Sequence, residues 1–174
     1  IITSRGCINR CAFCTDSPLW KVYRQKSAQK VVEEMKILTQ RYGLKNLEIL
    51  DSIFNADIAR LKTICEMLIQ ERKNIFWSAK VTARKEMTAS LLKLMKLSGC
   101  TELSYGIESG SARVLLDMRK NNDLREVERI IRDTSEAGIN AQCFFIIGYP
   151  TETEADFQLT LDFVKRNARF IHRF

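Results

Sequence analysis

The most informative stretch lies almost at the start of the chain, where residues 5–14 read RGCINRCAFC. It places Cys7, Cys11 and Cys14 in a C-x3-C-x2-C spacing directly after the apolar residues 1–2. Three thiolates this close together can hold an iron–sulfur cluster and leave one iron without a protein ligand. An electron-transfer cluster usually takes four cysteines, one for each iron, and this loop has no fourth cysteine nearby.

Two other interpretations of these cysteines stay open from the residues alone. A zinc site would need a fourth ligand, and the candidates are the distant Cys65 and the single histidine, His172. The thiols could also be reduced core residues that hold no metal. Buried cysteines are usually scattered singly over apolar faces, whereas these three flank Asn9 and Arg10 in loop-like sequence. The pattern therefore favours a metal centre.

The composition is that of an ordinary globular domain. The chain has 174 residues, 45% hydrophobic and 28% charged, which is enough for one sizeable core and predicts one domain. Three of the six cysteines are clustered and three isolated, which favours a metal site in a reducing, cytoplasmic compartment over a disulfide scaffold. We recognise neither an apolar stretch of membrane-spanning length nor a signal peptide, so no membrane span is expected.

The net charge of +7 is moderate. Most Lys and Arg residues lie between acids on expected helix faces, which favours a solvated surface over a nucleic-acid footprint. Nucleic acid is therefore not expected as a partner, although the charge leaves that alternative open.

Strand-like and helix-like patterns alternate along the whole chain. Helices are expected over residues 27–41, 56–72, 88–98, 123–138 and 154–167, and strands over residues 1–4, 47–51, 75–81, 102–106, 140–147 and 170–174. Thr151 with Glu154 predicts a capping box at the last helix. Six strands separated by helical segments predict a parallel sheet with right-handed crossovers, in a doubly wound sheet or a barrel. Polar residues at the carboxyl ends of the strands favour the barrel, because barrel active sites lie at that rim.

The chain is expected to be part of a longer protein. It has no initiator methionine, and it opens and stops inside apolar segments. We therefore expect a single domain, residues 1–174, that is truncated at both ends.

The chain resembles the radical S-adenosylmethionine enzymes over essentially its whole length. The resemblance rests on the three cysteines with Phe13 just before the last, and on three further stretches in matching order: DSIF at 51–54, GIESGS at 106–111 and FIIGYPTET at 145–153. The GIESG form and the segment YRQKS at 23–27 are similar to the branch that carries an upstream cobalamin-binding domain.

This resemblance implies an α/β fold, namely a partial (β/α)6 TIM-like barrel of parallel strands. It implies a [4Fe–4S] cluster on Cys7, Cys11 and Cys14, with S-adenosylmethionine chelating the open iron. Reductive cleavage of S-adenosylmethionine would give a 5′-deoxyadenosyl radical that acts on an unidentified substrate. The branch suggests a transferase that carries out cobalamin-dependent methylation, with cobalamin bound by a domain outside this chain. A flavodoxin or ferredoxin would supply the electron.

The resemblance also implies contacts with S-adenosylmethionine. Phe13 would lie beside the adenine, and Asp51 would accept a hydrogen bond from the ammonium group. Glu108 would contact the ribose hydroxyls or the amino group. Two structural alternatives stay open, in which Asp51 caps a strand end and Glu108 is an ordinary acid at a helix start.

Other residues have smaller implied roles at this site. Ser109 would be a weaker polar contact, and Ile147 and Gly148 would let the adenine approach the end of a strand. Three basic residues are candidates for neutralising the carboxylate of S-adenosylmethionine: Arg84, Arg119 and Lys120.

Two alternative functions are kept beside the main one. The chain could belong to a methylthiotransferase that acts on RNA or protein, which should carry a further cluster domain. It could also be a non-catalytic iron–sulfur or zinc-binding module in which an outside ligand completes the three cysteines.

Overall fold

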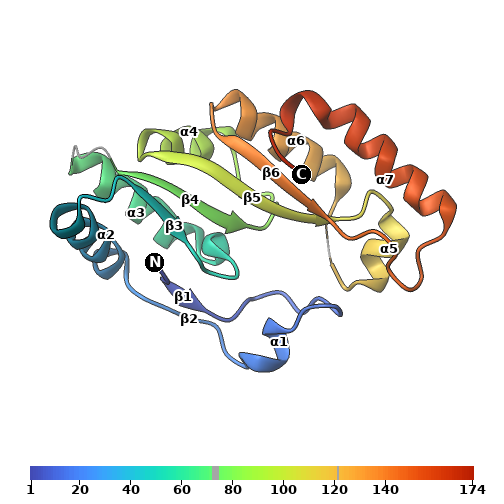
Figure 1. Cartoon of the computed structure of the whole chain (residues 1–174), viewed down its shortest axis with the longest axis horizontal. Helices are drawn as coiled ribbons and strands as arrows, with labels where there is room; N and C mark the ends of the chain where they lie inside the picture. Colours follow the sequence, from blue (N-terminus) through green and yellow to red (C-terminus); the bar gives the residue numbers. More distant parts are fainter. Residues whose placement is uncertain (72–74, 121) are drawn as a thin grey trace.

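The structure is a computed structural model that describes residues 1–71, 75–120 and 122–174. A central sheet of four parallel strands has the order β3-β4-β5-β6 (Figure 1). The strands span Asn46–Ile49 (β3), Phe76–Val81 (β4), Cys100–Glu108 (β5) and Asn140–Phe145 (β6). Neighbours in the sheet are thus neighbours along the chain, as expected for successive crossover connections.

Helices connect the strands close to the predicted positions. They span Asp16–Leu19 (α1), Ala28–Tyr42 (α2), Ile58–Gln70 (α3), Ala89–Leu97 (α4), Ala112–Asp117 (α5), Leu124–Glu136 (α6) and Glu154–Asn167 (α7). Short 3₁₀ turns lie at Phe54–Ala56 (η1) and Ala168–Phe170 (η2). Ser27 and Thr88 cap α2 and α4 through their side chains, which fixes where these helices begin.

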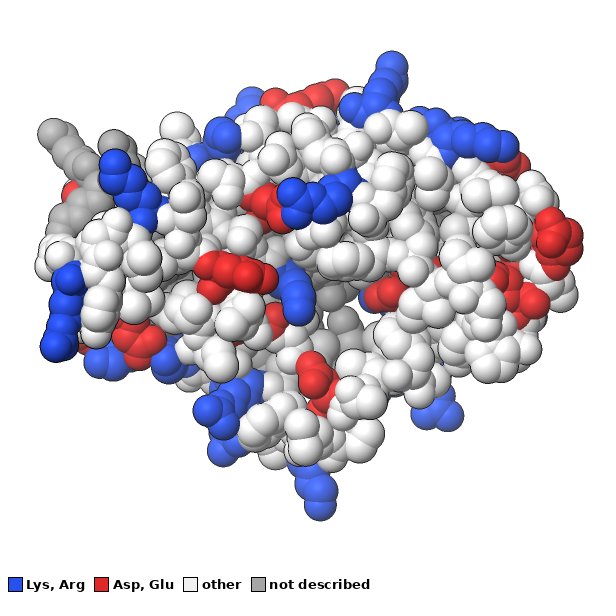
Figure 2. All heavy atoms as spheres, in the orientation of Figure 1, with Lys and Arg blue, Asp and Glu red and all other residues white. Residues whose placement is uncertain are grey.

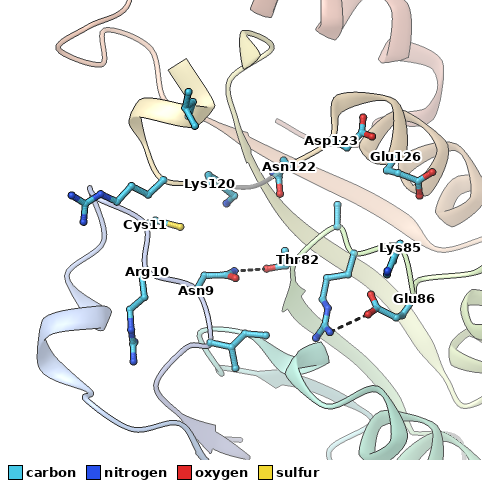
Figure 3. A pocket seen from close by; sticks show the side chains of 15 residues that line it. Asn9, Arg10, Cys11, Thr82, Lys85, Glu86, Lys120, Asn122, Asp123 and Glu126 are labelled. Carbon is cyan, nitrogen blue, oxygen red and sulfur yellow. Dashed lines mark hydrogen bonds and ion pairs between the residues drawn. The ribbon is translucent and has the colours of Figure 1, made fainter. Parts of the chain in front are cut away.

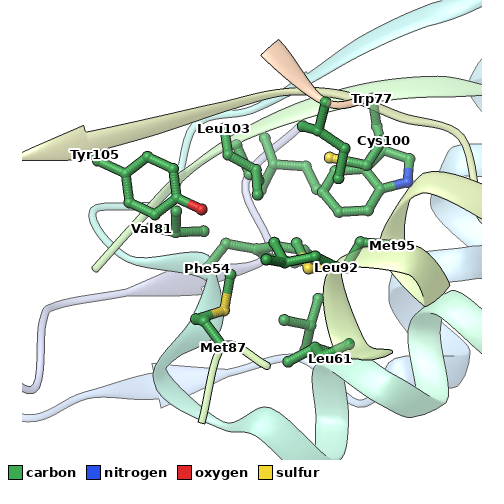
Figure 4. Close-up of a cluster of buried hydrophobic side chains, with 14 of the residues drawn as sticks. Phe54, Leu61, Trp77, Val81, Met87, Leu92, Met95, Cys100, Leu103 and Tyr105 are labelled. Atoms are coloured by element: carbon green, nitrogen blue, oxygen red, sulfur yellow. The ribbon is translucent and has the colours of Figure 1, made fainter. Parts of the chain in front are cut away.

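The helices cover one face of the sheet. Along β4, Trp77, Ala79 and Val81 are buried, whereas the alternating residues Phe76 and Lys80 are exposed. Figure 4 shows the buried side, where aromatic, aliphatic and sulfur-containing side chains of the sheet and its helices gather. A doubly wound sheet has helices on both faces, so this arrangement is that of a barrel segment. The predicted α/β partial barrel is confirmed.

The apolar core fixes how this sheet and its helices meet. Phe54 packs edge-on against Trp77 with ring centroids 5.5 Å apart, and both side chains are buried. The Trp77 indole donates to the Ser98 carbonyl oxygen at 3.2 Å, so its polar atom is satisfied. These contacts hold η1, β4 and the end of α4 together. No described helix is both long and apolar enough to cross a membrane.

The first and the last of the six expected strands differ from the prediction. Ile1 lies beside β3, where its carbonyl oxygen accepts from Leu50 N at 2.9 Å, but the first strand is β1 (Ser4–Arg5). It pairs antiparallel with β2 (Arg24–Gln25) in a separate two-stranded sheet. The expected strand at 170–174 contributes a single isolated bridge, in which Arg173 pairs with Gln142. The six expected parallel strands are therefore four within the described residues.

The capping box of α7 lies two residues later than predicted. Thr153 accepts from the backbone N–H of Asp156, and Asp156 accepts from the backbone N–H of Thr153. Thr151 instead donates to Asp117 Oδ2 at 2.6 Å. Both pairs match the sequence pattern of a cap, and the wider hydrogen-bond network of Asp156 favours the second. Asp156 also accepts from Ser111 Oγ at 2.6 Å.

Candidate functional site

The three clustered cysteines line one cavity of about 320 Å³. Each of these thiols is half-buried. The opposite wall comes from the inner face and the carboxyl ends of β4, β5 and β6. Its residues are Lys80, Val81, Thr82, Ser104, Gly106, Glu108 and Phe144. The segment that carries the three cysteines, residues 7–14, is called the cysteine loop. This loop and the strand ends are far apart in the sequence but enclose the same space.

Hydrogen bonds hold the cysteine loop against the sheet. Ala12 N donates to Met118 O at 2.8 Å, which ties the loop to the end of α5. Asn9 Nδ2 donates to Thr82 Oγ1 at 3.1 Å, which ties it to the end of β4. Asn55, fully buried, makes two hydrogen bonds with the backbone of Thr82 at 2.8 and 3.0 Å. The loop is thus anchored on two sides before any ligand binds.

Burial and the neighbouring polar groups act in opposite directions on the pKa of the thiols. Burial raises the pKa of Cys7 and of Cys11, so both thiols are protonated at neutral pH in the metal-free protein. The positive charge of Lys120 acts in the opposite direction on both. Asn9 N also donates to Cys7 Sγ at 3.4 Å, which favours the thiolate. These groups would stabilise anionic sulfur once a metal displaced the protons.

The donor set fits an iron–sulfur cluster with one open iron. Within residues 1–71, 75–120 and 122–174, the residues that line this cavity include no fourth cysteine and no histidine. In the same part of the chain, no three His, Cys, Asp or Glu side chains lie close enough together to hold a single metal ion. A polynuclear cluster takes one thiolate for each iron, so it accepts ligands that are spread around it.

A nearly buried ion pair lies next to the thiols. Lys120 Nζ is 2.7 Å from Glu108 Oε1, and the two side chains are 10% and 11% exposed. Glu108 has a positive φ of 72° and Arg119 one of 54°, conformations that non-glycine residues seldom adopt. A Cβ on Gly106 would collide with Glu108 Oε1 and with Lys120 Nζ, so a side chain there would displace the ends of both residues from this position. Backbone strain at functional sites often marks a side chain held in a working position.

A second, larger cavity of about 810 Å³ adjoins the first and shares Asn9, Cys11 and Thr82 with it. Figure 3 shows Asn9, Cys11 and Lys120 on one side of this cavity and Lys85 with Glu86 on the other. Its walls come from the cysteine loop, the segment after β4 and the connection between α5 and α6. A molecule in the larger cavity would lie beside the cysteine loop.

Asp51 has a different setting from the one that the resemblance implied. Its side chain is 1% exposed and lines neither cavity. Its two oxygens accept from the backbone N–H and hydroxyl groups of Thr3 (2.6 and 2.5 Å) and Ser4 (3.0 and 2.6 Å). These four donors already occupy the carboxylate, which supports the strand-end role that the sequence left open.

Among the other implied contacts, Glu108 lines the thiol cavity and the three basic candidates line the larger one, whereas the remaining four residues line neither. Ser109 is fully buried and bonds to Thr160 Oγ1 at 3.2 Å. Phe13 is 37% exposed and Ile147 57% exposed. Gly148 has a φ of 78° and its N–H donates to Glu152 Oε2 at 2.6 Å. The adenine contacts of Phe13, Ile147 and Gly148 stay predictions.

Lys80 and Thr82 belong to the polar strand ends that the sequence indicated, whereas Ser104, Asn9 and Asn55 were missed. Lys80 and Ser104 lie opposite each other in neighbouring strands and face the cavity. A period of two in the polar residues, visible along β4 and β5, could have indicated this inner face. Asn9 and Asn55 carried no such signal because their partners are remote in the sequence.

The six free thiols are expected to fall into two classes in the metal-free protein. The clustered thiols are reachable from a cavity, whereas the isolated ones are buried in the core: Cys65, Cys100 and Cys143. Burial raises the pKa of Cys65 to about 11 and that of Cys143 to about 12. We expect the core thiols to be alkylated by iodoacetamide at pH 8 at least about 100-fold more slowly than the clustered ones.

Peptide mass spectrometry after timed labelling measures this difference, and labelling in denaturant is the control that should make all six equal. Equal rates in the folded protein would contradict the burial described here.

The free energy of unfolding should depend on pH because of the same raised pKa values. An unfolded thiol ionises near pH 8.5, so the unfolded state gains an advantage as the pH rises from there towards the raised folded values.

Comparisons of the sequence with known proteins identify a family. Residues 1–164 match the Radical SAM superfamily. An uncharacterized methyltransferase of Pyrococcus horikoshii is 35% identical, over 95% of this chain and 36% of the relative. The cytidylyl-2-hydroxyethylphosphonate methyltransferase of Streptomyces wedmorensis is 32% identical, over 86% of this chain and 28% of the relative.

Solved structures agree on the fold. The radical S-adenosylmethionine methyltransferase TsrM from Kitasatospora setae, with cobalamin and a [4Fe-4S] cluster bound, superposes with a TM-score of 0.87 at 21% identity. The match covers 97% of this chain and 34% of that structure. The chain thus spans about a third of the length of the proteins it matches. By its sequence, its fold and its cysteine loop, the chain belongs to the Radical SAM superfamily.

Proposed function

We propose that this chain is the core of an enzyme that holds a [4Fe–4S] cluster on Cys7, Cys11 and Cys14 and binds S-adenosylmethionine beside it. With both groups bound, the chemistry supplied is reductive cleavage of S-adenosylmethionine to methionine and a 5′-deoxyadenosyl radical. The observation that carries the proposal is the thiol cavity, which is lined by three half-buried cysteines and by Glu108, whose ion-pair partner Lys120 lines the adjoining larger cavity.

The ion pair is a suitable receptor for the amino-acid end of S-adenosylmethionine. That end is a zwitterion, so Glu108 would take the ammonium group and Lys120 the carboxylate, exchanging one pairing of opposite charges for two. Among the three basic candidates, Lys120 lies beside the cysteine loop and is nearly buried. Arg84 is engaged with the carbonyl oxygens of Asn55 and Ala56 at 3.1 and 2.7 Å, which supports a structural role.

We assign the larger cavity to the substrate. Its volume of about 810 Å³ and its common wall with the thiol cavity support this assignment. Methylation that depends on cobalamin is the proposed reaction, with cobalamin held by a domain outside this chain. The methyltransferase names of the two relatives and the cobalamin in the TsrM structure support it.

A flavodoxin or ferredoxin is the proposed source of the electron, because family chemistry needs a reductant. The six cysteines are all free thiols, which supports a reducing, cytoplasmic setting.

Anaerobic reconstitution of the full-length protein with iron and sulfide tests the proposal. After reduction with titanium(III) citrate, addition of S-adenosylmethionine should yield 5′-deoxyadenosine and methionine. A protein that takes up four irons for each chain and releases neither product would contradict the enzymatic function and favour a non-catalytic module. Uptake of zinc alone under strict exclusion of air would contradict the cluster.

The Lys120→Gln variant should bind S-adenosylmethionine about 10- to 100-fold more weakly than wild type, because it loses one charge-assisted hydrogen bond. Isothermal titration of the reconstituted protein measures the affinity, and visible absorbance checks that the cluster is retained. Lys85→Gln removes an exposed charge from the same large cavity and is the matched control. An unchanged affinity in Lys120→Gln would mean that another residue pairs with the carboxylate.

A further inference from the structure

A basic and apolar surface lies immediately outside the cysteine loop. We name it the Trp20 surface and define it by Arg5, Leu19, Trp20, Lys21, Val22 and Arg24. Leu19 is 70% exposed and Val22 65% exposed. Figure 2 shows Lys and Arg side chains along the lower edge of the molecule, over the region where Figure 1 draws β1, β2 and α1. Exposed apolar side chains thus lie among cations on this surface.

The charges of this surface are arranged unfavourably for an isolated protein. Arg5 and Arg24 lie directly opposite each other in the antiparallel β1–β2 pair. Like charges in such positions destabilise a sheet. Both guanidinium groups lie over the Trp20 ring, 5.3 and 5.9 Å from its centroid. Cation–π contacts of this kind offset part of the repulsion and present both charges on one face.

The nearby acids are engaged with other groups. Asp16 accepts from Ser52 Oγ at 2.5 Å, and Glu34 pairs with Lys26 at 2.7 Å. Asp57 accepts from Gln25 Nε2 at 2.8 Å and caps α3. Among the described residues, no salt bridge to Arg5, Lys21 or Arg24 is present. Within the part of the chain that the structure describes, these three cations are thus not paired with a carboxylate, and an acidic partner would supply one.

Direct contacts link this surface to the cysteine loop. Arg10, which lies between Cys7 and Cys11, donates to Cys7 O at 3.3 Å and to Lys21 O at 3.2 Å. A Cβ on Gly6 would lie 3.1 Å from Val22 O and 3.3 Å from Trp20 Cβ, so the two segments are packed together. A protein bound on this surface would therefore touch a segment that packs directly against the cysteine loop.

We propose that the Trp20 surface is where a flavodoxin-type electron carrier docks. This inference rests on the proposed function, because it assumes a cluster on the three cysteines. A flavodoxin has an acidic surface around an exposed, apolar flavin edge, which complements an apolar centre ringed by cations. In each encounter the reduced flavin loses one electron and the oxidised cluster gains it, so the carrier is the reductant and no further reactant is needed.

Anaerobic stopped-flow reduction of the reconstituted full-length protein by photoreduced flavodoxin tests this assignment. The variant is Lys21→Glu with Arg24→Glu. The control is Lys62→Glu with Lys93→Glu, which makes the same change in net charge on exposed positions of α3 and α4. We expect the second-order rate constant of the first variant to fall at least about tenfold at 20 mM ionic strength and to approach the wild-type value at 0.5 M, because salt screens the attraction. The control should stay within about twofold of wild type.

Titanium(III) citrate separates this inference from the proposed function. If the chemical reductant drives product formation in every variant, the cluster and the enzymatic function stand, and the flavodoxin rates decide the docking surface alone. Equal flavodoxin rates in wild type and both variants would overturn the docking surface, as would equal losses in both variants. The single variant Lys21→Glu, with an expected smaller loss, keeps the test valid if the double variant misfolds. A mobility shift with a single-stranded RNA 20-mer that Lys21→Glu/Arg24→Glu abolishes, with unchanged reduction rates, would identify a nucleic-acid surface instead.

Discussion

Replacing Cys11 with alanine is expected to reduce formation of 5′-deoxyadenosine to background while the protein stays folded. The thiol lies half-buried on a cavity wall, and the turn that carries it is held by backbone contacts, such as Cys14 N to Cys11 O at 3.2 Å. Two remaining thiolates cannot hold a cluster that needs three, so the loss should exceed about 1,000-fold. Anaerobic product assays by liquid chromatography, with iron and sulfide counted in the same samples, measure this effect.

Cys65→Ala is the matched control for this experiment. It removes the same atom from a cysteine of α3 that is fully buried in the core. This variant should lose about 1 kcal/mol of stability, because one buried sulfur leaves a small cavity, and should keep the cluster and its activity. Wild-type product yields in Cys11→Ala would contradict the proposed ligand set.

Replacing Asp51 with alanine is expected to lower the free energy of unfolding by about 3 kcal/mol or more. The carboxylate is 1% exposed and accepts four hydrogen bonds from Thr3 and Ser4. Arg60, itself 6% exposed, donates to Thr3 Oγ1 at 2.8 Å and would lose a nearby opposite charge. Burial lowers the pKa of Arg60, and the negative charge of Asp51 is among the neighbours that act in the opposite direction. Urea unfolding of the metal-free protein measures the loss.

The comparison with Asp57→Ala separates structure from binding. Asp57 caps α3 from a more exposed position, so its loss should cost only about 1 kcal/mol. Because Thr3 and Ser4 lead into the cysteine loop, Asp51→Ala should also lower cluster uptake. If Asp51→Ala unfolds like wild type, takes up its cluster and binds S-adenosylmethionine weakly, then Asp51 contacts the ammonium group and the structural role is wrong.

The helices and the inner strands could be predicted because their signals are local. Ser27 and Thr88 mark helix starts through bonds to residues three positions on, and the 3.6-residue spacing of apolar residues defines the buried faces. The predictions of the outermost strands failed because a segment becomes a strand only through backbone pairing with an adjacent strand. Residues 170–174 are apolar enough for a strand, and they form hydrogen bonds with Ala141 and Cys143 of β6, but these bonds make a single isolated bridge and not a ladder.

The candidate site likewise has one part that local sequence predicts and another that only packing reveals. Its thiols were evident because their spacing of three and two intervening residues is itself the ligand pattern. The proposed role of Lys120 was not evident, because it depends on the ion pair with Glu108, which folding forms across the positive φ of Arg119. Nothing in the local sequence separates Lys120 from the other two basic candidates.

Gly110 illustrates the limit of a motif. The sequence places it in the GIESGS stretch, next to the implied cofactor contacts Glu108 and Ser109. In the structure a Cβ there would lie 2.6 Å from Leu159 O and 2.7 Å from Thr160 Cα, so this glycine allows α7 to pack against the end of β5. The packing partner is about fifty residues away, which no local pattern reports.

The sequence alone therefore determined the ligand spacing, the helix starts and the α/β alternation, because each depends on residues within a few positions of one another. Only the tertiary structure decided that Asp51 is enclosed by Thr3 and Ser4, that Lys120 pairs with Glu108, and that Asn9 meets Thr82. These contacts join segments from 12 to more than 70 residues apart. Such pairings depend on how the strands and helices pack together, and a charge or hydroxyl group gains its role from the partner that packing brings to it.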